Sequence, residues 1–340
     1  MSEPIVIWGA GAIGGTMGAY WARAGHSVLL VDVVEPHVAA CAAAGLSIEG
    51  PVENFRQRIP AVTPDALEGV YQRIVLAVKA QATEAALQAL KPHLAADGFV
   101  LSAQNGLNEI AISEAIGAER TMGCFVNFGA DWLEPGKILF GNRGAVVVGE
   151  LDGITRPRTR AMHELLQVFE PDAVLTGNIW GYLWGKLAYG AMLFASALNN
   201  DSIHQNFKDP ARREVWIALG REVMRIAAAR GISAVGFNGF DPAAFAPGAA
   251  DAAAVQSIAD LAEFNRTSAK THSGVWRDLA VRKRRTEIDP QILIIAEIGK
   301  QLGIEAPVIR RVVELIHDVE DGRRAQSAET FAELFKALPQ

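Results

Sequence analysis

The stretch IVIWGAGAIGG, residues 5–15, decides the fold of this chain. Its first four residues are apolar, which predicts a strand buried on both faces, as in a parallel sheet. The three glycines that follow fit the G-x-G-x-x-G pattern. Gly9 permits a tight turn, Gly11 lets the backbone approach a diphosphate, and Gly14 lets the next helix pack closely on the strand. The stretch therefore predicts a strand, a glycine turn and a helix that together bind a dinucleotide.

The residues around this turn support the same prediction. Ala12 and Ile13 lie inside the pattern, and the helix expected over residues 14–24 points its N-terminus at the diphosphate. A second strand, residues 27–31, ends at Asp32, close to the position about 20 residues on where the ribose-binding acid lies. A carboxylate there accepts both ribose hydroxyls of NAD and repels the 2′-phosphate of NADP.

The residue after Asp32 bears on the choice of cofactor. NADP sites usually place Arg or Lys there, and this chain has Val33. We therefore expect NAD, with NADP as the alternative. Two structural alternatives stay open, namely an aspartate that only caps the next helix and a glycine turn without a ligand.

Composition limits the classes of protein to consider. The 340 residues suffice for two domains, and half of them are hydrophobic, which indicates a globular protein. The net charge of −6, without a basic domain, argues against a nucleic-acid partner. Cys41 and Cys124 lack metal-ligand spacing, so we expect no metal site and reduced thiols in a cytoplasmic protein. We expect no membrane span, because no uncharged apolar run reaches about 18 residues. We also expect no signal peptide, because the N-terminus leads directly into the first strand.

The first half of the chain alternates strands and helices, which predicts an α/β fold with a Rossmann-type doubly wound sheet. Residues 129–140 and 141–150 are expected to form an antiparallel extension that turns at Gly141 and Asn142. The expected strands span residues 5–8, 27–31, 74–78, 99–103, 120–126, 145–148 and 173–176, and the expected helices 14–24, 36–43, 83–90, 109–116 and 155–169.

From residue 179 onward the apolar residues recur with a helical period, which predicts an all-α second domain. With the boundary near Gly177, we expect a dinucleotide-binding domain over residues 1–177 and a helical substrate and catalytic domain over 178–340. The apolar helices of the second half make a homodimer plausible. The helices are expected over residues 180–198, 211–229, 252–267, 290–302 and 306–319, with a loop over 236–248 and one amphipathic helix in the tail, 321–340.

Four side chains outside the glycine turn suggest chemistry. Lys79 and Asn105 each follow an expected strand, at the sheet edge where ligands bind. Lys186 lies in a very apolar helix, where an ammonium group needs a partner or a lowered pKa, so it is a candidate general acid. Glu287 is its candidate partner. The structural alternatives are a solvated strand end for Lys79 and an Asn-Gly turn at Asn105.

The chain resembles the ketopantoate reductase (2-dehydropantoate 2-reductase) family. The resemblance implies a Rossmann domain and a helical domain with the active site between them, and reduction of a 2-oxo acid by NADPH. It also implies that Lys186 is the general acid, that Glu287 assists it, and that Lys79 and Asn105 line the nicotinamide and substrate site. The motifs span residues 9–14, 78–80, 104–106, 184–187 and 286–289.

Departures from the family pattern point to a divergent member with a different substrate. Gly190 and Phe194 stand where the family places two asparagines that hold the substrate, and a site built for hydrogen bonds discriminates strongly. Polar contacts could come instead from Asn199, His272 or Ser273. We expect hydride transfer between a nicotinamide cofactor and a small 2-oxo acid/2-hydroxy acid pair, or a related secondary alcohol. The alternatives are an authentic NADPH-dependent 2-dehydropantoate 2-reductase and a non-catalytic NAD-binding sensor.

Overall fold

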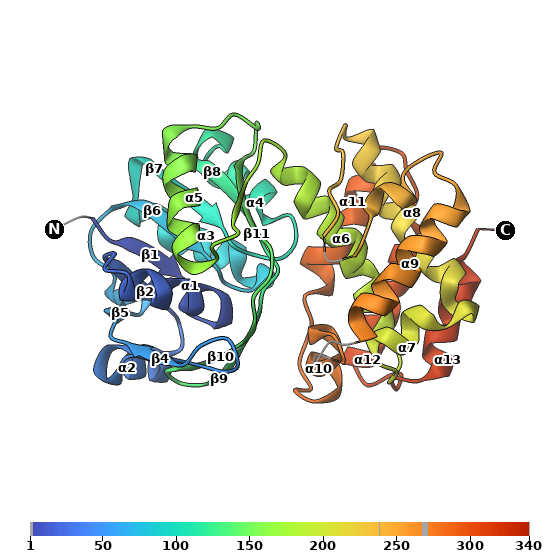
Figure 1. Ribbon diagram of the computed structural model, residues 1–340, viewed down its shortest axis with the longest axis horizontal. Coiled ribbons are helices and arrows are strands. Elements are labelled where there is room, and N and C mark those ends of the chain that lie inside the picture. Colours follow the sequence, from blue (N-terminus) through green and yellow to red (C-terminus); the bar gives the residue numbers. More distant parts are fainter. Residues whose placement is uncertain (1–2, 238, 267–270, 340) are drawn as a thin grey trace. The chain divides into compact units, whose positions relative to one another are not determined.

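The structure, a computed structural model, describes residues 3–237, 239–266 and 271–339. It divides into two compact units, Met1–Ile179 and Trp180–Gln340. The first unit is α/β and the second is built of helices (Figure 1). The predicted fold class, a Rossmann-type sheet followed by an all-α part, is confirmed.

Eight of the described strands form the main sheet of the first unit, in the order β12-β11-β8-β7-β6-β1-β2-β5. Every adjacent pair is parallel except β8 and β11, which are antiparallel. The strands are β1 (Ile5–Trp8), β2 (Val28–Val31), β5 (Ala61–Val62), β6 (Tyr71–Leu76), β7 (Leu94–Ser102), β8 (Thr121–Val126), β11 (Val146–Glu150) and β12 (Val174–Leu175).

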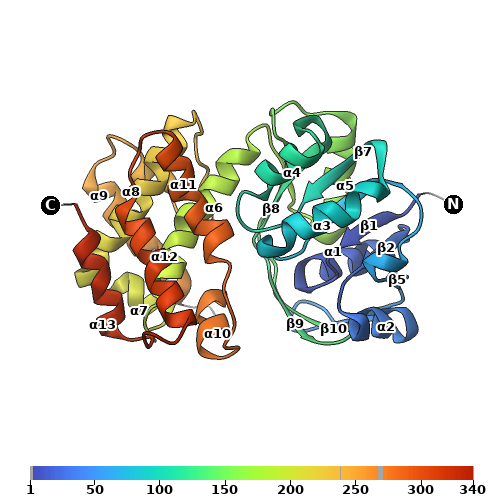
Figure 2. The same cartoon turned by 180° about the vertical axis from the view of Figure 1, so that it is seen from behind.

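Helices cover both faces of this sheet, as the apolar first strand predicts. Ile5 and Ile7 of β1 belong to one hydrophobic cluster with α1 and α5, whereas Val6 and Trp8 belong to a second cluster with α3 and α4. Figure 1 shows α1 and α5 on one face, and Figure 2 shows α3 and α4 on the other. The helices are α1 (Ala12–Arg23), α2 (Glu35–Ala44), α3 (Thr83–Leu90), α4 (Asn108–Ile116) and α5 (Pro157–Phe169).

A second sheet, of order β4-β3-β10-β9, corrects one prediction. The hairpin pairs β9 with β10 and turns at Pro135 and Gly136, so the expected turn at Gly141 and Asn142 is wrong. Gly136 has a φ of 74°, which favours glycine, whereas residues 146–150 are fully buried and therefore join the main sheet as β11. The strands of this sheet are β3 (Leu46–Glu49), β4 (Phe55–Gln57), β9 (Gly129–Glu134) and β10 (Lys137–Asn142).

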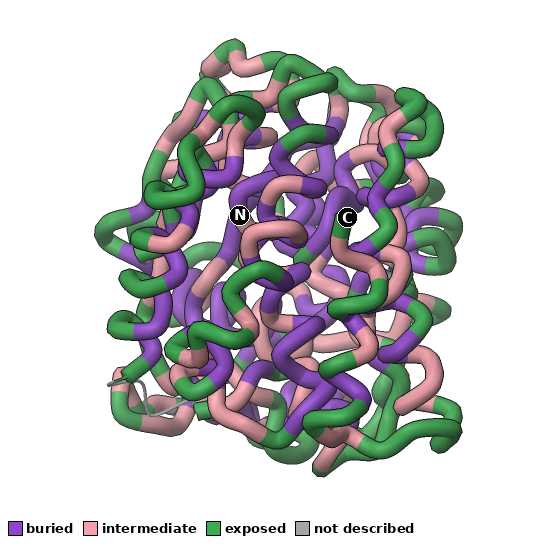
Figure 3. Tube along the Cα trace, turned by 90° about the vertical axis from the view of Figure 1, so that its right-hand side faces the viewer, coloured by how far each residue is buried: buried purple, intermediate pink, exposed green. Residues whose placement is uncertain are grey.

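The helical unit buries one face of each long helix, and the tube in Figure 3 changes between buried and exposed along them. Two short helices, α7 and α10, are absent from the prediction, and the tail, expected to hold one amphipathic helix, holds α13 followed by a 3₁₀ turn. Thr267, Asn238 and Gln340, which fall in predicted segments, lie outside the described residues. The helices are α6 (Ile179–Ser196), α7 (Ile203–Lys208), α8 (Arg213–Ala229), α9 (Asp251–Arg266), α10 (Gly274–Ala280), α11 (Ile294–Gln301), α12 (Pro307–Glu320) and α13 (Ala328–Ala332).

A buried carboxylate joins α8 to the N-terminus of α12. Glu222 is 5% exposed, and its two oxygens accept hydrogen bonds from the backbone N–H groups of Val308 at 3.0 Å and Ile309 at 2.9 Å. The first N–H groups of a helix have no partner within the helix, so Glu222 satisfies two of them and complements the helix dipole.

We predict that Glu222→Leu destabilises the helical unit by about 1–3 kcal/mol, because it leaves the N–H groups of Val308 and Ile309 buried without an acceptor. Chemical denaturation measures the loss. Glu214→Leu, at an exposed position on the same helix, is the matched control and should change the free energy of unfolding by less than about 0.5 kcal/mol. Equal effects of the two substitutions would contradict the assignment.

Candidate active site

The glycine turn lies at the carboxyl ends of four adjacent parallel strands. Trp8 of β1 pairs with Val31 of β2 on one side and with Leu76 of β6 on the other, and Leu76 pairs with Ser102 of β7. The N–H of Gly9 extends this row by donating to the carbonyl of Val31 at 2.8 Å. After β1 the chain continues to β2 on one side, and it later forms β6 on the other side of β1. This edge is therefore the switch point at which open α/β sheets bind ligands.

Two glycines of the turn are required by the fold itself. Gly9 has a φ of 97°, and a Cβ on it would lie 2.7 Å from the backbone nitrogen of Val78. A Cβ on Gly14 would meet the carbonyl oxygen of Gly9 and would lie 2.7 Å from Cγ2 of Ile7. The positive φ and the close approach of helix to strand therefore exclude a side chain at both positions.

Gly11 is different, because no described atom lies within 4 Å of the place where its Cβ would be. Its φ of −69° and ψ of −159° are open to any residue. It is the N-cap of α1, and among the described residues no side chain caps this end and no acidic residue lies in the first turn. The N-terminal N–H groups of α1 therefore suit an anion, and the bare backbone of Gly11 leaves room for one.

The Asp32 carboxylate lies beside this turn. Its Oδ2 accepts a hydrogen bond from the backbone N–H of Ala10 at 2.8 Å, and its Oδ1 accepts one from Val34 at 2.9 Å. The N-cap of α2 is Val34, not Asp32, so the carboxylate is oriented by the glycine turn as well as by its own loop. A carboxylate has about four acceptor positions, and two of them remain for ribose hydroxyls.

Hydrogen bonds tie together the loops that carry Lys79 and Asn105, two exposed residues at the ends of β6 and β7. Nε2 of Gln104 donates to the carbonyl just before Lys79 at 2.9 Å and to Oγ1 of Thr83 at 2.8 Å. The Thr83 hydroxyl donates to Oδ1 of Asn108 at 2.9 Å, and Asn108 donates to the carbonyl of Asn105 at 2.7 Å. These hydrogen bonds therefore fix the position of the Lys79 loop relative to the Asn105 loop.

Sequence reasoning missed part of this network. It named Gln104 only as a member of the Gln-Asn-Gly motif and did not single out Thr83 or Asn108, whose polar side chains open α3 and α4. Oε1 of Gln104 is buried, and no described group donates a hydrogen bond to it. A buried acceptor of this kind suits an N–H group of a ligand or an ordered water.

Lys186 and Glu287, the two predicted catalytic residues, both belong to the helical unit. Lys186 is partly buried on α6 between the buried residues Trp184 and Leu187. Glu287 is partly buried just before the π-helical turn η7 (Asp289–Leu293). A Cβ on Gly190, one turn after Lys186, would lie 4.0 Å from Cδ1 of Ile292 in that turn, so the helix of Lys186 packs near the segment that follows Glu287.

Hydrogen bonds to the Glu320 carboxylate and within the backbone hold the segment of Glu287. Oε1 of Glu320, at the end of α12, accepts hydrogen bonds from the N–H and the hydroxyl of Thr286, each at 2.7 Å. The carbonyl of Glu287 accepts from the N–H of Gln291 at 3.1 Å. The backbone at Glu287 is therefore fixed on both sides.

Three residues predicted to contact substrate lie on α6 or just after it, in surroundings that differ from one to the next. Phe194 is 2% exposed within α6, and Gly190 on the same helix carries no donor. The side-chain amide of Asn199 forms hydrogen bonds with the turn before α7 and with α7 itself. Its oxygen accepts from the N–H of Asp201 at 2.8 Å, and its nitrogen donates to Oδ1 of Asn206 at 2.8 Å. These bonds give Asn199 a structural role.

His272 and Ser273 begin α10. The Ser273 hydroxyl is the N-cap and accepts from the N–H of Trp276 at 3.1 Å. The His272 ring packs on the ring of Trp276 with centroids 4.1 Å apart, and its Nε2 lies 3.2 Å from the carbonyl oxygen of Asn200. Local structure therefore accounts for the hydrogen-bond acceptor of Ser273 and for the ring of His272.

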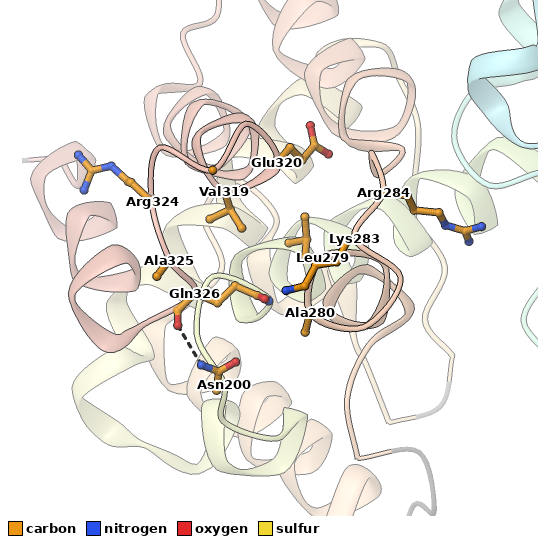
Figure 4. A pocket seen from close by; sticks show the side chains of 11 residues that line it. Asn200, Leu279, Ala280, Lys283, Arg284, Val319, Glu320, Arg324, Ala325 and Gln326 are labelled. Atoms are coloured by element: carbon orange, nitrogen blue, oxygen red, sulfur yellow. Dashed lines mark hydrogen bonds between the residues drawn. The ribbon is translucent and has the colours of Figure 1, made fainter.

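A cavity of about 560 Å³ in the helical unit contains none of the predicted site residues. The guanidinium groups of Arg284 and Arg324 point away from it in Figure 4 and pair with Asp278 at 2.9 Å and Asp318 at 3.1 Å. The wall of this cavity is therefore formed where α10 meets the end of α12. The cavity gives no evidence for the candidate active site. The lining residues are Asn200, Leu279, Ala280, Lys283, Arg284, Val319, Glu320, Gly322, Arg324, Ala325 and Gln326.

Within residues 3–237, 239–266 and 271–339, no three side chains of His, Cys, Asp or Glu gather as metal ligands would. Over the same residues, no helix combines the length and the apolar character needed to cross a bilayer.

The sheet, its switch point and the glycine turn define a dinucleotide-binding protein of the Rossmann class. Two family models match the chain, "Ketopantoate reductase PanE/ApbA" over residues 5–153 and its C-terminal counterpart over residues 178–320. The chain belongs to the ketopantoate reductase family. It is accordingly an NAD(P)-dependent oxidoreductase that acts on a CH–OH group and uses a nicotinamide cofactor and a small-molecule substrate.

Individual relatives agree with this assignment. The 2-dehydropantoate 2-reductase of Pyrococcus horikoshii is 28% identical over 320 residues, which cover 89% of this chain and 93% of the relative. A PanE/ApbA family ketopantoate reductase from Ralstonia eutropha JMP134 superposes with a TM-score of 0.78, is 25% identical, and covers 95% of this chain and 100% of its own. D-Mandelate dehydrogenase in complex with NADH and anilino(oxo)acetate superposes with a TM-score of 0.80 at 22% identity, covering 94% and 98%, which shows the shared fold.

We predict that alanine at Gly14 affects stability, whereas alanine at Gly11 affects cofactor binding. Gly14→Ala should lower the free energy of unfolding by about 1–3 kcal/mol, because its Cβ has no room. Gly11→Ala should leave stability unchanged but weaken NADH binding by about tenfold or more, ~1.4 kcal/mol. Thermal unfolding of the cofactor-free protein and fluorescence titration with NADH measure the two effects. Unchanged NADH affinity in Gly11→Ala would contradict a cofactor role for this residue.

Proposed function

We propose that this chain transfers hydride reversibly between NAD(H) and a 2-oxo acid/2-hydroxy acid pair, or a related secondary alcohol. One observation carries the proposal: Gly11, where a Cβ would meet no described atom, follows Ala10, whose N–H binds the Asp32 carboxylate at the switch point of the sheet. In this proposal Met1–Ile179 is the cofactor domain, and Trp180–Gln340 supplies the acid–base group and binds substrate.

The residues of the first unit fit a nicotinamide dinucleotide. Gly9, Gly11 and Gly14, with Ala12 and Ile13, would hold the diphosphate, and the Asp32 carboxylate would accept hydrogen bonds from the adenosine ribose. In addition, Lys79 and Asn105 would line the nicotinamide end, next to the buried acceptor of Gln104. When bound, the cofactor supplies or receives the hydride.

In the proposed reaction Lys186 carries the proton. During reduction its ammonium group donates a proton to the carbonyl oxygen of the substrate as the carbonyl carbon receives hydride, which yields the alcohol and a neutral amine. In the oxidation direction the neutral amine takes the hydroxyl proton back. Glu287 would stabilise the charged form of Lys186. The hydrogen bonds from Thr286 to the Glu320 carboxylate support this role by holding the segment in place.

NAD is favoured over NADP by the pair Asp32 and Val33. The Asp32 carboxylate would repel a 2′-phosphate, and Val33 is 76% exposed, so no positive charge is presented there. Glu35 and Pro36 follow, and neither is basic.

We predict that Val33→Arg shifts the cofactor preference toward NADPH by about tenfold, ~1.4 kcal/mol. The exposure of Val33 means that the substitution should not affect folding. Adding Asp32→Ser should extend the shift to about 100-fold. Dissociation constants for NADH and NADPH, compared among the wild type, Val33→Arg and the control Val70→Arg, measure the effect. Val70 is 61% exposed and precedes the start of β6, at the sheet edge opposite the glycine turn. A wild-type enzyme that already prefers NADPH would refute the proposed NAD preference.

The substrate is proposed to be less polar than ketopantoate. Positions 190 and 194 hold glycine and phenylalanine, so neither offers a hydrogen bond to a hydroxy acid. Asn199 is left out of the proposed substrate contacts because of its structural bonds. An authentic 2-dehydropantoate 2-reductase is the alternative. A panel of 2-oxo acids that includes ketopantoate, assayed with NADH and NADPH, separates the two, because rapid NADPH-dependent turnover of ketopantoate supports the alternative.

We predict that Lys186→Met lowers kcat by about 10²–10⁴-fold and leaves the affinity for NADH unchanged. Lys208→Met removes an exposed lysine of the same unit and should leave kcat unchanged. The measurements are turnover of the best 2-oxo acid from the panel and titration with NADH. If Lys186→Met retained full turnover, Lys186 would not be the acid, and the alternative of a non-catalytic sensor would gain support.

Two further expectations belong to the same proposal. Reduced Cys41 and Cys124, both fully buried, support a cytoplasmic location. The apolar helices of the second half support a homodimer.

A further inference from the structure

A buried imidazole connects the glycine turn to the second sheet. His37, on α2, is 1% exposed, yet it was not among the residues that the sequence singled out. Its Nε2 lies 2.9 Å from the carbonyl oxygen of Ala10, in the middle of the glycine turn. Its Nδ1 receives hydrogen bonds from the N–H of Gly136 at 2.9 Å and from Nε1 of Trp132 at 3.2 Å.

These partners fix the tautomer of His37. A carbonyl oxygen only accepts, so Nε2 must carry the proton that binds Ala10. The N–H groups of Gly136 and Trp132 only donate, so Nδ1 must be unprotonated. His37 is therefore a neutral imidazole with a donor on the glycine turn and an acceptor on the hairpin of β9 and β10.

The hairpin side of this arrangement is rigid. Gly136 has a φ of 74°, and a Cβ on it would lie 2.9 Å from Cβ of Ala40 on α2, so only glycine brings this N–H close to His37. The carbonyl of Gly136 accepts from the N–H of Ser47 at 2.9 Å, which fastens the turn to β3. Nδ1 of His37 is therefore held by a turn that has no freedom of its own.

The glycine-turn side leads to the cofactor. Ala10 accepts from His37 through its carbonyl, and its N–H donates to Oδ2 of Asp32 at 2.8 Å. One residue of the turn is thus fixed at both of its polar backbone atoms. Resting on the dinucleotide site proposed above, we propose that His37 is a positioning residue for NAD(H): it fixes Ala10 and, through Ala10, orients the Asp32 carboxylate toward the ribose.

Cys41 offers a competing role for His37, that of a base for a reactive thiol. Its Sγ lies 3.7 Å from Nε2 of His37. Burial, with a smaller contribution from the charge of Asp32, raises the pKa of the Cys41 thiol to about 11, so the thiol stays protonated and unreactive. The Nε2 proton of His37 is committed to Ala10, which leaves positioning as its role.

Three substitutions separate the two ends of the imidazole. The Gln side chain places its N–H₂ group near the position of Nε2, so His37→Gln keeps a donor for Ala10. In contrast, the Asn side chain places its oxygen near Nδ1, so His37→Asn keeps only the acceptor for Gly136. His37→Leu removes both. We expect the NADH dissociation constant to rise by about tenfold in His37→Asn and His37→Leu, and by less than about threefold in His37→Gln.

Kinetics and hydrogen exchange provide further readouts. In His37→Asn the KM for NADH should rise with the dissociation constant, whereas kcat at saturating NADH should stay within about twofold of the wild type. In the cofactor-free protein, the peptide that contains Ala10 should exchange its amide hydrogens faster in His37→Asn than in His37→Gln. The affinity for NADPH should fall less than that for NADH, because Asp32 contributes only to NADH.

His163, on α5 in the same unit, provides the matched control, since its Nε2 lies 2.7 Å from the carbonyl oxygen of Ala173, which follows that helix. His163→Asn should cost stability without changing the NADH dissociation constant. If NADH affinity follows the melting temperature across all four variants, or if His37→Asn binds NADH as tightly as the wild type, the positioning role is refuted. A wild-type protein that binds neither NADH nor NADPH refutes the dinucleotide site itself, which is a separate outcome.

Discussion

The in-register parallel pairing of β1 with β2 and β6 is the constraint on which the site depends. Trp8 lies level with Val31 and Leu76, so the chain leaves all three strands at one height. β1 lies between β2 and β6, and the connections to these two strands run in opposite directions along the sheet. At such a point no crossover helix covers the turn after β1. The glycine pattern has meaning only there, since the same residues elsewhere would form an ordinary turn.

The three glycines of the turn meet two different requirements, which are close packing and room for the proposed ligand. Gly9 and Gly14 satisfy packing, because a side chain at either position meets backbone or a core residue. A Cβ on Gly11 would meet no described atom, so packing does not require glycine there, and the proposed contact with the cofactor diphosphate supplies a reason for it. The same sequence pattern therefore holds two positions that packing explains and one that the proposed cofactor site explains, which is the division of roles that the pattern predicts.

Sequence reasoning located the features that are local. The apolar strand, the glycines and Asp32 lie within 32 residues of the N-terminus and follow one another in sequence. It misplaced the hairpin turn, because Gly141 and Asn142 have turn composition while β10 runs through them, and it missed β3, β4 and β5, which have at most four residues. It also missed His37, whose partners Trp132 and Gly136 lie 95 and 99 residues away. Contacts of that range depend on strand order, which no local pattern encodes.

The helical unit places different requirements on its candidate residues. In the proposed reaction Lys186 donates the proton and must hold its position, and α6 supports this because Trp184 and Leu187 on either side of Lys186 are buried. Substrate contacts can vary around such a fixed group without changing the chemistry. Glycine and phenylalanine at positions 190 and 194 lie one and two turns further along the same helix, so a change in the polarity of the bound substrate leaves the acid in place. Under the proposed function, a rigid acid with substrate contacts on neighbouring turns would allow one fold to keep its reaction while its substrate changes.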